Sequence, residues 1–273
     1  MSRDIWNPER YRTYAAERAR PFSELLARVD VDDPRHVVDL GCGPGERTAD
    51  LAARWPGARV EGVDSSARMI AEARGAALGA RVRFSIGDLA MWKPDGLVDV
   101  IFSHAALQWV PGHQSLLPRW VDALASGGRL AFGMPGNFDA PSHVILRELC
   151  AAPRWRDRLA ATVRHDVVST LTEYAGLLAG LGCEVDAWET TYLQILPGPD
   201  PVLEWMSGTA LRPVFDALPD DTEREEFRAE LAVRLRAAYP RRSCGTVFPF
   251  RRIFVVARRP SPPPNAEAKG SEW

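Results

Sequence analysis

The sequence has few cysteines, and they form no recognisable motif. Its four cysteines, Cys42, Cys150, Cys183 and Cys244, are far apart and include no C-x-x-C pair. This spacing favours neither a disulfide framework nor a zinc site, so we predict no bound metal and a reducing compartment such as the cytoplasm.

Long apolar runs and a strong excess of one charge are also missing. Residues 1–8 contain no apolar signal core, and no run approaches the ~20 apolar residues that a membrane-spanning helix needs. The net charge is −2, so the global charge does not indicate nucleic acid or an anionic membrane as a partner. With 273 residues, of which 46% are hydrophobic, the chain can bury a sizeable core as one α/β domain. We expect a monomer or a weak dimer.

A glycine-rich stretch at residues 37–45, Val-Val-Asp-Leu-Gly-Cys-Gly-Pro-Gly, organises the rest of the chain. Apolar residues surround Asp39, and Gly41, Gly43 and Gly45 follow at alternate positions. This pattern predicts a buried strand, a tight turn and a helix. Glycine allows positive φ and close approach of the backbone to a ligand, and the first N–H groups of a helix lack intrahelical partners. The G-x-G-x-G spacing is one residue shorter than the dinucleotide fingerprint.

Two further strands are expected to end in an acidic residue. Residues 58–64 end at Asp64, and residues 82–88 end at Asp88. In a doubly wound sheet, an acid after the second strand can accept hydrogen bonds from both ribose hydroxyls of an adenosine ligand. Asp88 could accept one from an adenine amino group. A helix is expected from Ser65 onward, because serine can cap free N–H groups.

The order of the remaining elements predicts the fold class. Strands and helices alternate from residue 36 to 135, which indicates a doubly wound parallel sheet with helices on both faces. Two later strands, at 184–196 and 251–258, bring the sheet to seven strands, with the last one antiparallel. Residues 8–29 are predicted as two short helices broken at Pro21.

The glycine turn and the acid at the end of the second strand resemble the class I S-adenosylmethionine-dependent methyltransferases, whose first motif has the form D-x-G-x-G-x-G. The resemblance implies a Rossmann-like methyltransferase fold with S-adenosylmethionine as the cofactor. It implies cofactor contacts at nine positions, which are Asp39, Gly41, Gly43, Asp64, Ser65, Met69, Asp88, Leu89 and His104.

The domain boundaries follow from this interpretation. We expect one methyltransferase domain over residues 1–260, with its cofactor-binding core at 30–135. The Pro-rich tail at 261–273 has nothing to bury and is expected to be disordered. Three segments are expected to cover the active site, namely 1–29, 138–180 and 197–245.

Residues 103–109, Ser-His-Ala-Ala-Leu-Gln-Trp, follow the fourth strand. Ligands of open α/β sheets bind outside the carboxyl ends of the strands, so this loop is expected to face the cofactor. His104 could act as a base, although a histidine bonded to the backbone is the plainer interpretation.

A second resemblance, to the trans-aconitate 2-methyltransferases, covers nearly the whole chain except the tail. These are bacterial cytosolic enzymes. The resemblance includes segments outside the cofactor motif, where substrate specificity normally resides. It rests on residues 6–11, 17–21, 106–109, 134–135, 141–144, 147–148, 182–186, 190–192, 209–213 and 253–259.

This resemblance implies methyl transfer from S-adenosylmethionine to one carboxylate of trans-aconitate, which gives the monomethyl ester. A carboxylate is ionised at neutral pH, so the nucleophile needs no general base, and catalysis would rest on holding oxygen, methyl and sulfur in line. The other two carboxylates need cationic partners, and planar arginine forks suit them best. The candidates for substrate binding are Tyr14, Arg20, Arg147, Tyr192 and Arg212, and those for orientation are Gln108, Trp109 and His143.

Three other interpretations remain open. The first is a methyltransferase acting on another small organic acid, or on a phenol or a carbon atom. A phenol or a carbon atom would need a base such as His104, His113 or His143. A non-catalytic methyltransferase-fold subunit is disfavoured because the three glycines and Asp64 are all present. A nicotinamide oxidoreductase is disfavoured by the spacing of the glycines.

Overall fold

The computed structural model describes residues 15–76, 78–163 and 168–261. Tyr14 and residues 262–273 of the predicted tail lie outside this part of the chain. Within it, no helix is long and apolar enough to cross a membrane.

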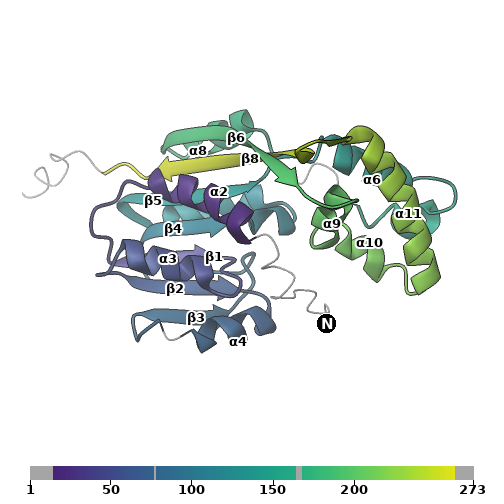
Figure 1. Cartoon of the computed structure of the whole chain (residues 1–273). Coiled ribbons are helices and arrows are strands. Elements are labelled where there is room, and N and C mark those ends of the chain that lie inside the picture. The colour runs from purple at the N-terminus through teal and green to yellow at the C-terminus, as the bar shows by residue number, and fades with distance from the viewer. Residues whose placement is uncertain (1–14, 77, 164–167, 262–273) are drawn as a thin grey trace, which may run out of the picture.

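One twisted sheet forms the centre of the molecule (Figure 1). Its strand order is β3-β2-β1-β4-β5-β8-β6, and β1 to β5 run parallel. β8 lies antiparallel between β5 and β6, and the two-residue β7 pairs only with β8. The predicted doubly wound, mostly parallel seven-stranded sheet is confirmed, with β7 as a short addition. The strands are β1 His36–Leu40, β2 Arg59–Asp64, β3 Val82–Ile86, β4 Val98–His104, β5 Leu124–Pro135, β6 Glu184–Leu196, β7 Arg241–Arg242 and β8 Gly245–Arg258.

Helices cover both faces of this sheet. Successive residues of a strand point to opposite faces, so Val37 of β1 joins the apolar cluster under α2 and α3, whereas Val38 joins the cluster under α5 and α8. α4 packs beside β2 and β3 through Met69, Ile70 and Ala73. These helices are α2 Ala15–Ala27, α3 Glu46–Arg54, α4 Ala67–Gly75, α5 Leu117–Asp122 and α8 Leu171–Gly180.

The described part of the N-terminal segment forms one helix, α2, which runs through Pro21. The predicted break at this residue is therefore wrong. An interior proline costs a helix about 3 kcal/mol, whereas each large apolar side chain gains about 1.5–3 kcal/mol on burial. Phe22, Leu25 and Val29 are all at most 1% exposed, so packing against the sheet outweighs the loss of one backbone hydrogen bond.

Glu24 ties α2 to the sheet. Its carboxylate accepts hydrogen bonds from Trp188 Nε1 at 2.8 Å, from Thr190 Oγ1 at 2.5 Å and from the hydroxyl of Tyr192. The three donors alternate along β6, so they lie on one face of that strand. Three donors are enough to hold this carboxylate of α2 in its ionised form.

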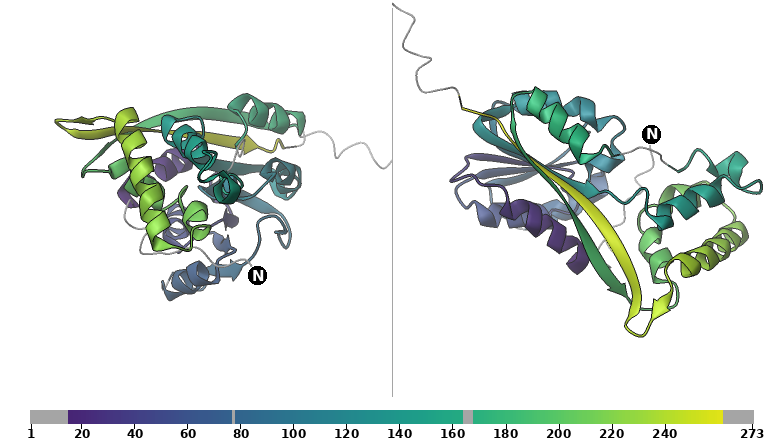
Figure 2. Two further views of the ribbon diagram at one scale, coloured as in Figure 1. Left: turned by 90° about the vertical axis from the view of Figure 1, so that its right-hand side faces the viewer. Right: turned by 90° about the horizontal axis from the view of Figure 1, so that it is seen from above.

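The far ends of β6 and β8 extend beyond the sheet and carry a group of helices, which we call the helical lobe (Figure 2). These helices share one hydrophobic cluster with Leu196, Phe248 and Phe250 of the two strands. α8, by contrast, packs on the sheet through Tyr174 and Leu178. The lobe consists of α6 Pro141–Cys150, α7 Arg156–Leu159, α9 Pro201–Ser207, α10 Arg212–Asp216 and α11 Asp221–Ala238.

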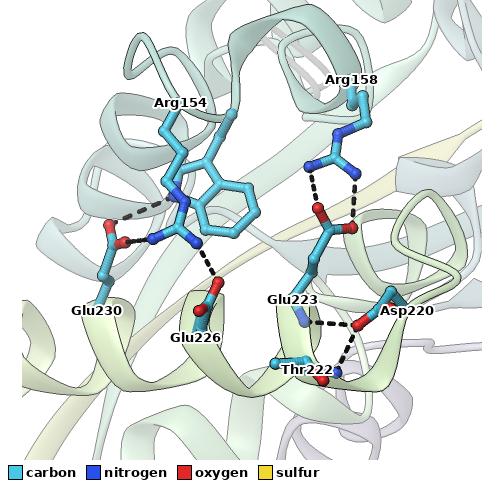
Figure 3. Close-up of polar contacts among 8 residues, drawn as sticks. Arg154, Arg158, Asp220, Thr222, Glu223, Glu226 and Glu230 are labelled. Atoms are coloured by element: carbon cyan, nitrogen blue, oxygen red, sulfur yellow. Dashed lines mark hydrogen bonds and ion pairs between the residues drawn. The ribbon is translucent and has the colours of Figure 1, made fainter.

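Charged side chains join the segment around α7 to α11 at the surface of the lobe (Figure 3). Arg158 forms a bidentate pair with Glu223 of α11, at 2.6 and 2.7 Å, and Arg154 pairs with Glu226 and Glu230. Exposed pairs of this kind contribute little to stability. Arg154 and Arg158 nevertheless bind α11 and do not line the cavity.

Replacing Glu24 by glutamine should destabilise the protein in a pH-dependent way. Burial alone would raise the pKa of Glu24, but the hydrogen bonds from Thr190, Tyr192 and Trp188 outweigh it and hold the pKa below the ordinary value of 4.5. A lowered folded-state pKa stabilises the fold above pH 4.5, and this contribution is lost as the pH falls through the folded-state pKa. We expect Glu24→Gln to cost about 1.5–3 kcal/mol at pH 7, and the difference from wild type to shrink below pH 4.5.

Denaturant unfolding at several pH values measures this difference. Asp186→Asn is the matched control, because Asp186 also joins β6 to α2, through Arg28, but is 52% exposed. A Glu24→Gln penalty no larger than that of the control would contradict the anchoring role.

Candidate active site

The glycine turn lies at the carboxyl end of β1, as predicted. Gly41, Gly43 and Gly45 all have positive φ, at 83°, 55° and 85°. The N–H groups of Gly41 and Cys42 both donate to the carbonyl of Val63, at 2.7 and 3.1 Å, and so hold the turn against the end of β2. An ideal Cβ on Gly41 would lie 2.1 Å from Cβ of Ala106. Glycine is thus required at position 41 both by its φ and by the loop that follows β4.

Asp64 lies beside this turn at the end of β2. Its carboxylate accepts hydrogen bonds from the N–H of Gly43 at 3.0 Å and from the N–H of Ser66 at 2.8 Å. The acid therefore orders the glycine turn and joins it to the start of α4.

Asp39 is buried directly behind the turn. Its carboxylate accepts a hydrogen bond from Thr48 Oγ1 at 2.6 Å. Burial and the negative charge of Asp64 raise the pKa of Asp39 to about 7, although the bond from Thr48 opposes the shift. Because a nearby positive charge favours the ionised form of a carboxylate, a cationic ligand next to the turn would restore the charge of Asp39.

The remaining residues predicted to bind the cofactor surround the same end of the sheet. Ser66 caps α4 by accepting a hydrogen bond from the N–H of Met69, and Ser65 is exposed before it. Asp88 is exposed after β3 and accepts a hydrogen bond from the N–H of Ala90 at 2.8 Å. Leu89 is buried, and its side chain lies 3.8 Å from the Cβ position of Gly41. The set fits an adenosine-type cofactor, with a close-approach turn, an acid for a ribose and apolar side chains beside them.

A cavity adjoins this site between the sheet and the helical lobe. Two arginines and two histidines line it, and the lining residues of the described chain include no aspartate or glutamate. It therefore suits an anion. The lining residues are His104, Ala105, Gln108, Trp109, Pro135, Asn137, Phe138, His143, Leu146, Arg147, Thr162, Val163, Trp205, Met206, Thr209, Ala210, Pro213, Phe248, Phe250 and Arg252.

The loop after β4 connects the glycine turn to the cavity. The N–H of Ala105 donates to the carbonyl of Gly133 at 2.7 Å, and Gln108 Nε2 donates to the carbonyl of Ala105 at 2.7 Å. A 3₁₀ turn, Leu107–Trp109, then brings Gln108 and Trp109 to the cavity wall. The structure thus places His104, Gln108 and Trp109 together, between the predicted cofactor and the predicted substrate.

His143 and Arg147 reach the cavity from α6. Arg147 Nη1 donates to the carbonyl of Phe138 at 2.6 Å, which holds the guanidinium end of the side chain in place. Burial and the positive charge of Arg147 lower the pKa of His143 to about 4. His143 is therefore a neutral hydrogen-bonding group at neutral pH.

Three other residues predicted to bind the substrate are not among those that line the cavity. The hydroxyl of Tyr192 donates to Glu24, and the guanidinium of Arg20 lies 5.2 Å from the centre of the Tyr192 ring. Arg212 is the first residue of α10, next to Pro213, which does line the cavity. Tyr14 lies outside the described residues.

Sequence reasoning missed several polar residues of the cavity, among them Asn137 and Arg252. Asn137 follows the carboxyl end of β5, which is where ligands of such sheets bind, so its position along the chain was an available signal. Arg252 lies inside the last strand, and only the pairing of β8 with both β5 and β6 shows that it is buried.

Comparison with known proteins agrees with the geometry of the site. Residues 37–128 match a family model described as a methyltransferase domain. The trans-aconitate 2-methyltransferase of Mycolicibacterium gilvum is 54% identical over 257 residues, which cover 93% of this chain and 99% of that protein. The enzyme of the same name from Streptomyces coelicolor is 52% identical over 263 residues, covering 93% and 87%.

A solved structure shares the fold at low sequence identity. Phosphoethanolamine N-methyltransferase 2 of Haemonchus contortus, in complex with S-adenosyl-L-methionine, superposes with a TM-score of 0.54 at 18% identity. The match covers 88% of this chain and 52% of that one. At this identity the likeness supports the fold alone.

Gly41→Ala should disable the predicted S-adenosylmethionine site, and a second substitution should restore it. The added methyl group would clash with Cβ of Ala106, whereas in Gly41→Ala/Ala106→Gly the nearest atom is the Ala106 Cα position, at 3.6 Å. The strain of a positive φ, about 1 kcal/mol for a non-glycine residue, remains in the double variant. We expect calorimetric titration with S-adenosylmethionine to show the weakest binding for Gly41→Ala and intermediate binding for the double variant.

Gly79→Ala is the matched control, because Gly79 also has a positive φ, at 81°, nothing lies within 4 Å of its Cβ position, and it is not among the predicted cofactor contacts. If Ala106→Gly fails to improve binding by Gly41→Ala, the contact between the turn and the loop after β4 does not control the site.

Proposed function

Since the chain belongs to the trans-aconitate 2-methyltransferase family, we propose that it transfers a methyl group from S-adenosylmethionine to one carboxylate of trans-aconitate, giving the monomethyl ester. The observation that carries this proposal is the charge of the cavity. Arg147 and Arg252 line it without any acidic neighbour among its described lining residues. Burying an unpaired carboxylate is costly, so a cavity of this kind favours a polyanion.

We assign cofactor binding to the residues around the glycine turn. Asp64 would receive the ribose hydroxyls, and Gly41 and Gly43 would allow the backbone to approach the ligand. Met69, Asp88 and Leu89 would surround the adenine, and His104 would lie at the methionine end. When bound, S-adenosylmethionine supplies an electrophilic methyl group on a sulfonium centre.

The protein's own contribution to the methyl transfer is to orient the substrate and to exclude water. Gln108 and Trp109 lie on the loop that joins the cofactor site to the cavity, so they would position the reacting carboxylate against the methyl group. Near-attack positioning of this kind can supply about 7–11 kcal/mol of the barrier reduction. The helical lobe would cover the cavity and keep water from the neutralising charges.

No histidine of the site is needed as a base in this reaction. His113 is fully buried, and its Nε2 lies 2.6 Å from the hydroxyl of Tyr174. A histidine with a pKa of about 4, as for His143, is a weak base. Methylation of a phenol or a carbon atom would therefore have to rely on His104, whereas a carboxylate is already ionised.

We also propose that the enzyme works in the cytoplasm as a monomer or a weak dimer. A nucleic acid or a membrane has no place in the proposed reaction.

Arg147 is proposed to bind a carboxylate that does not react. Removing one member of a buried charge pair costs about 2–5 kcal/mol, so Arg147→Ala should raise KM for trans-aconitate at least about 30-fold. Arg147→Lys should recover only part of the loss, because lysine cannot supply a bidentate fork. Steady-state assays with an isotope-labelled methyl donor measure both variants.

Arg154→Ala is the control, because Arg154 binds Glu226 and Glu230 at the surface of the same lobe. A wild-type KM in Arg147→Ala would remove Arg147 from the proposed site. If the wild-type enzyme transfers no methyl group to trans-aconitate, the proposed function itself is wrong.

A further inference from the structure

Asn137 is a buried amide at the cavity wall whose polar atoms indicate a binding site. Its side chain is 2% exposed and lines the cavity. Neither Oδ1 nor Nδ2 has a hydrogen-bond partner among the described residues. Buried amides without partners are rare, because the lost hydrogen bonds to water are not replaced. A ligand in the cavity would supply the missing partner.

The backbone holds Asn137 firmly in this position. The N–H of Gly136 donates to the carbonyl of Arg251 at 3.0 Å, and the carbonyl of Asn137 accepts from the N–H of Ala140 at 3.0 Å. The first bond continues the pairing of β5 with β8, and the second closes the turn before α6. The amide is therefore placed by elements on both sides of it, which is what a preorganised binding group requires.

Arg252 reaches the cavity from the neighbouring strand. Residues at alternate positions of a strand share one face, and Phe248, Phe250 and Arg252 of β8 all line the cavity. Arg252 is 5% exposed, and its guanidinium lies 5.0 Å from the centre of the Phe250 ring. In the sheet register it is opposite Pro135, two residues before Asn137. Arg252 of β8 and Asn137, which follows β5, thus lie at the same end of the sheet.

We propose that Asn137 and Arg252 form a carboxylate-binding subsite on the sheet side of the cavity, opposite Arg147 on the lobe side. It would hold one of the two carboxylates that do not react. This inference rests on the proposed function for the identity of the polycarboxylate. The guanidinium supplies charge, and Nδ2 of Asn137 supplies a neutral donor at a fixed place.

Such a subsite explains how the cavity would select a tricarboxylate. Arg252 and Arg147 reach the cavity from different parts of the fold, so two non-reacting carboxylates can be neutralised separately. Arg252 attracts the carboxylate by charge, and the amide of Asn137 favours one orientation of the substrate, because it donates from one fixed point. The subsite therefore determines which carboxylate is left to face the methyl donor.

Three dicarboxylates test the subsite, since each lacks a different carboxylate of trans-aconitate. These are mesaconate, cis-glutaconate and itaconate. Their dissociation constants, and that of trans-aconitate, can be measured calorimetrically in the presence of S-adenosylhomocysteine, where no turnover occurs. We expect Asn137→Ala and Arg252→Gln each to weaken trans-aconitate binding at least about 10-fold, and Asn137→Asp to weaken it further by repulsion. For the one dicarboxylate that lacks the bound carboxylate, the variants and wild type should agree within about twofold.

Arg251→Gln is the matched control, because Arg251 precedes Arg252 on the same strand but pairs at the surface with Glu189 at 2.9 Å. This control should bind all four ligands as wild type does, and all variants should keep wild-type affinity for S-adenosylhomocysteine. Unchanged trans-aconitate binding in Asn137→Ala would overturn the proposal, and so would an equal loss for all three dicarboxylates. Turnover by the wild-type enzyme separates the two claims: if it methylates trans-aconitate while the variants bind normally, only the subsite is refuted.

Discussion

The close contact between the glycine turn and the loop after β4 is the constraint on which the rest of the site depends. Gly41 lies so close to Ala106 that no side chain fits between them. The same turn is held by the carbonyl of Val63 and by the carboxylate of Asp64. Three strand ends are thereby locked into one arrangement. Gln108 and Trp109, on the loop after β4, thereby acquire a fixed position relative to the predicted cofactor.

The second half of the site comes from the long antiparallel pair formed by β6 and β8. These strands carry the helical lobe away from the sheet (Figure 2). Residues of the sheet and of the lobe together line the cavity. The lobe has its own apolar cluster, and ion pairs at its surface join Arg154 and Arg158 to α11. Most of its arginines are thereby committed to structure, whereas Arg147 of α6 faces the cavity. The packing of the helices thus decides which arginines reach the cavity and can meet a substrate.

The parts of the fold that depend on local patterns were predictable, and those that depend on distant pairing were not. The glycine turn, the acid after β2 and the doubly wound, mostly parallel sheet follow from short motifs and from alternation along the chain. The continuity of α2 through Pro21 depends on its packing against the sheet, and the role of Glu24 depends on three donors that lie more than 160 residues away. Tyr192 illustrates the same limit, because its hydroxyl is bonded to Glu24. Arg252 has a neighbour of the same type, and only the three-dimensional pairing of β8 distinguishes the buried arginine from the exposed one.

The central claim is that the nucleophile is a carboxylate that is already ionised and needs no enzymatic base. The most direct test is the pH dependence of kcat, measured at saturating concentrations of both substrates, with the product analysed for a base-labile methyl ester. The account predicts a monomethyl ester and a nearly flat profile from about pH 6 to 9, above the carboxyl pKa values near 4. A profile that rises through a single pKa near 6.5, the ordinary value of histidine, or a methyl group that resists base, would contradict it.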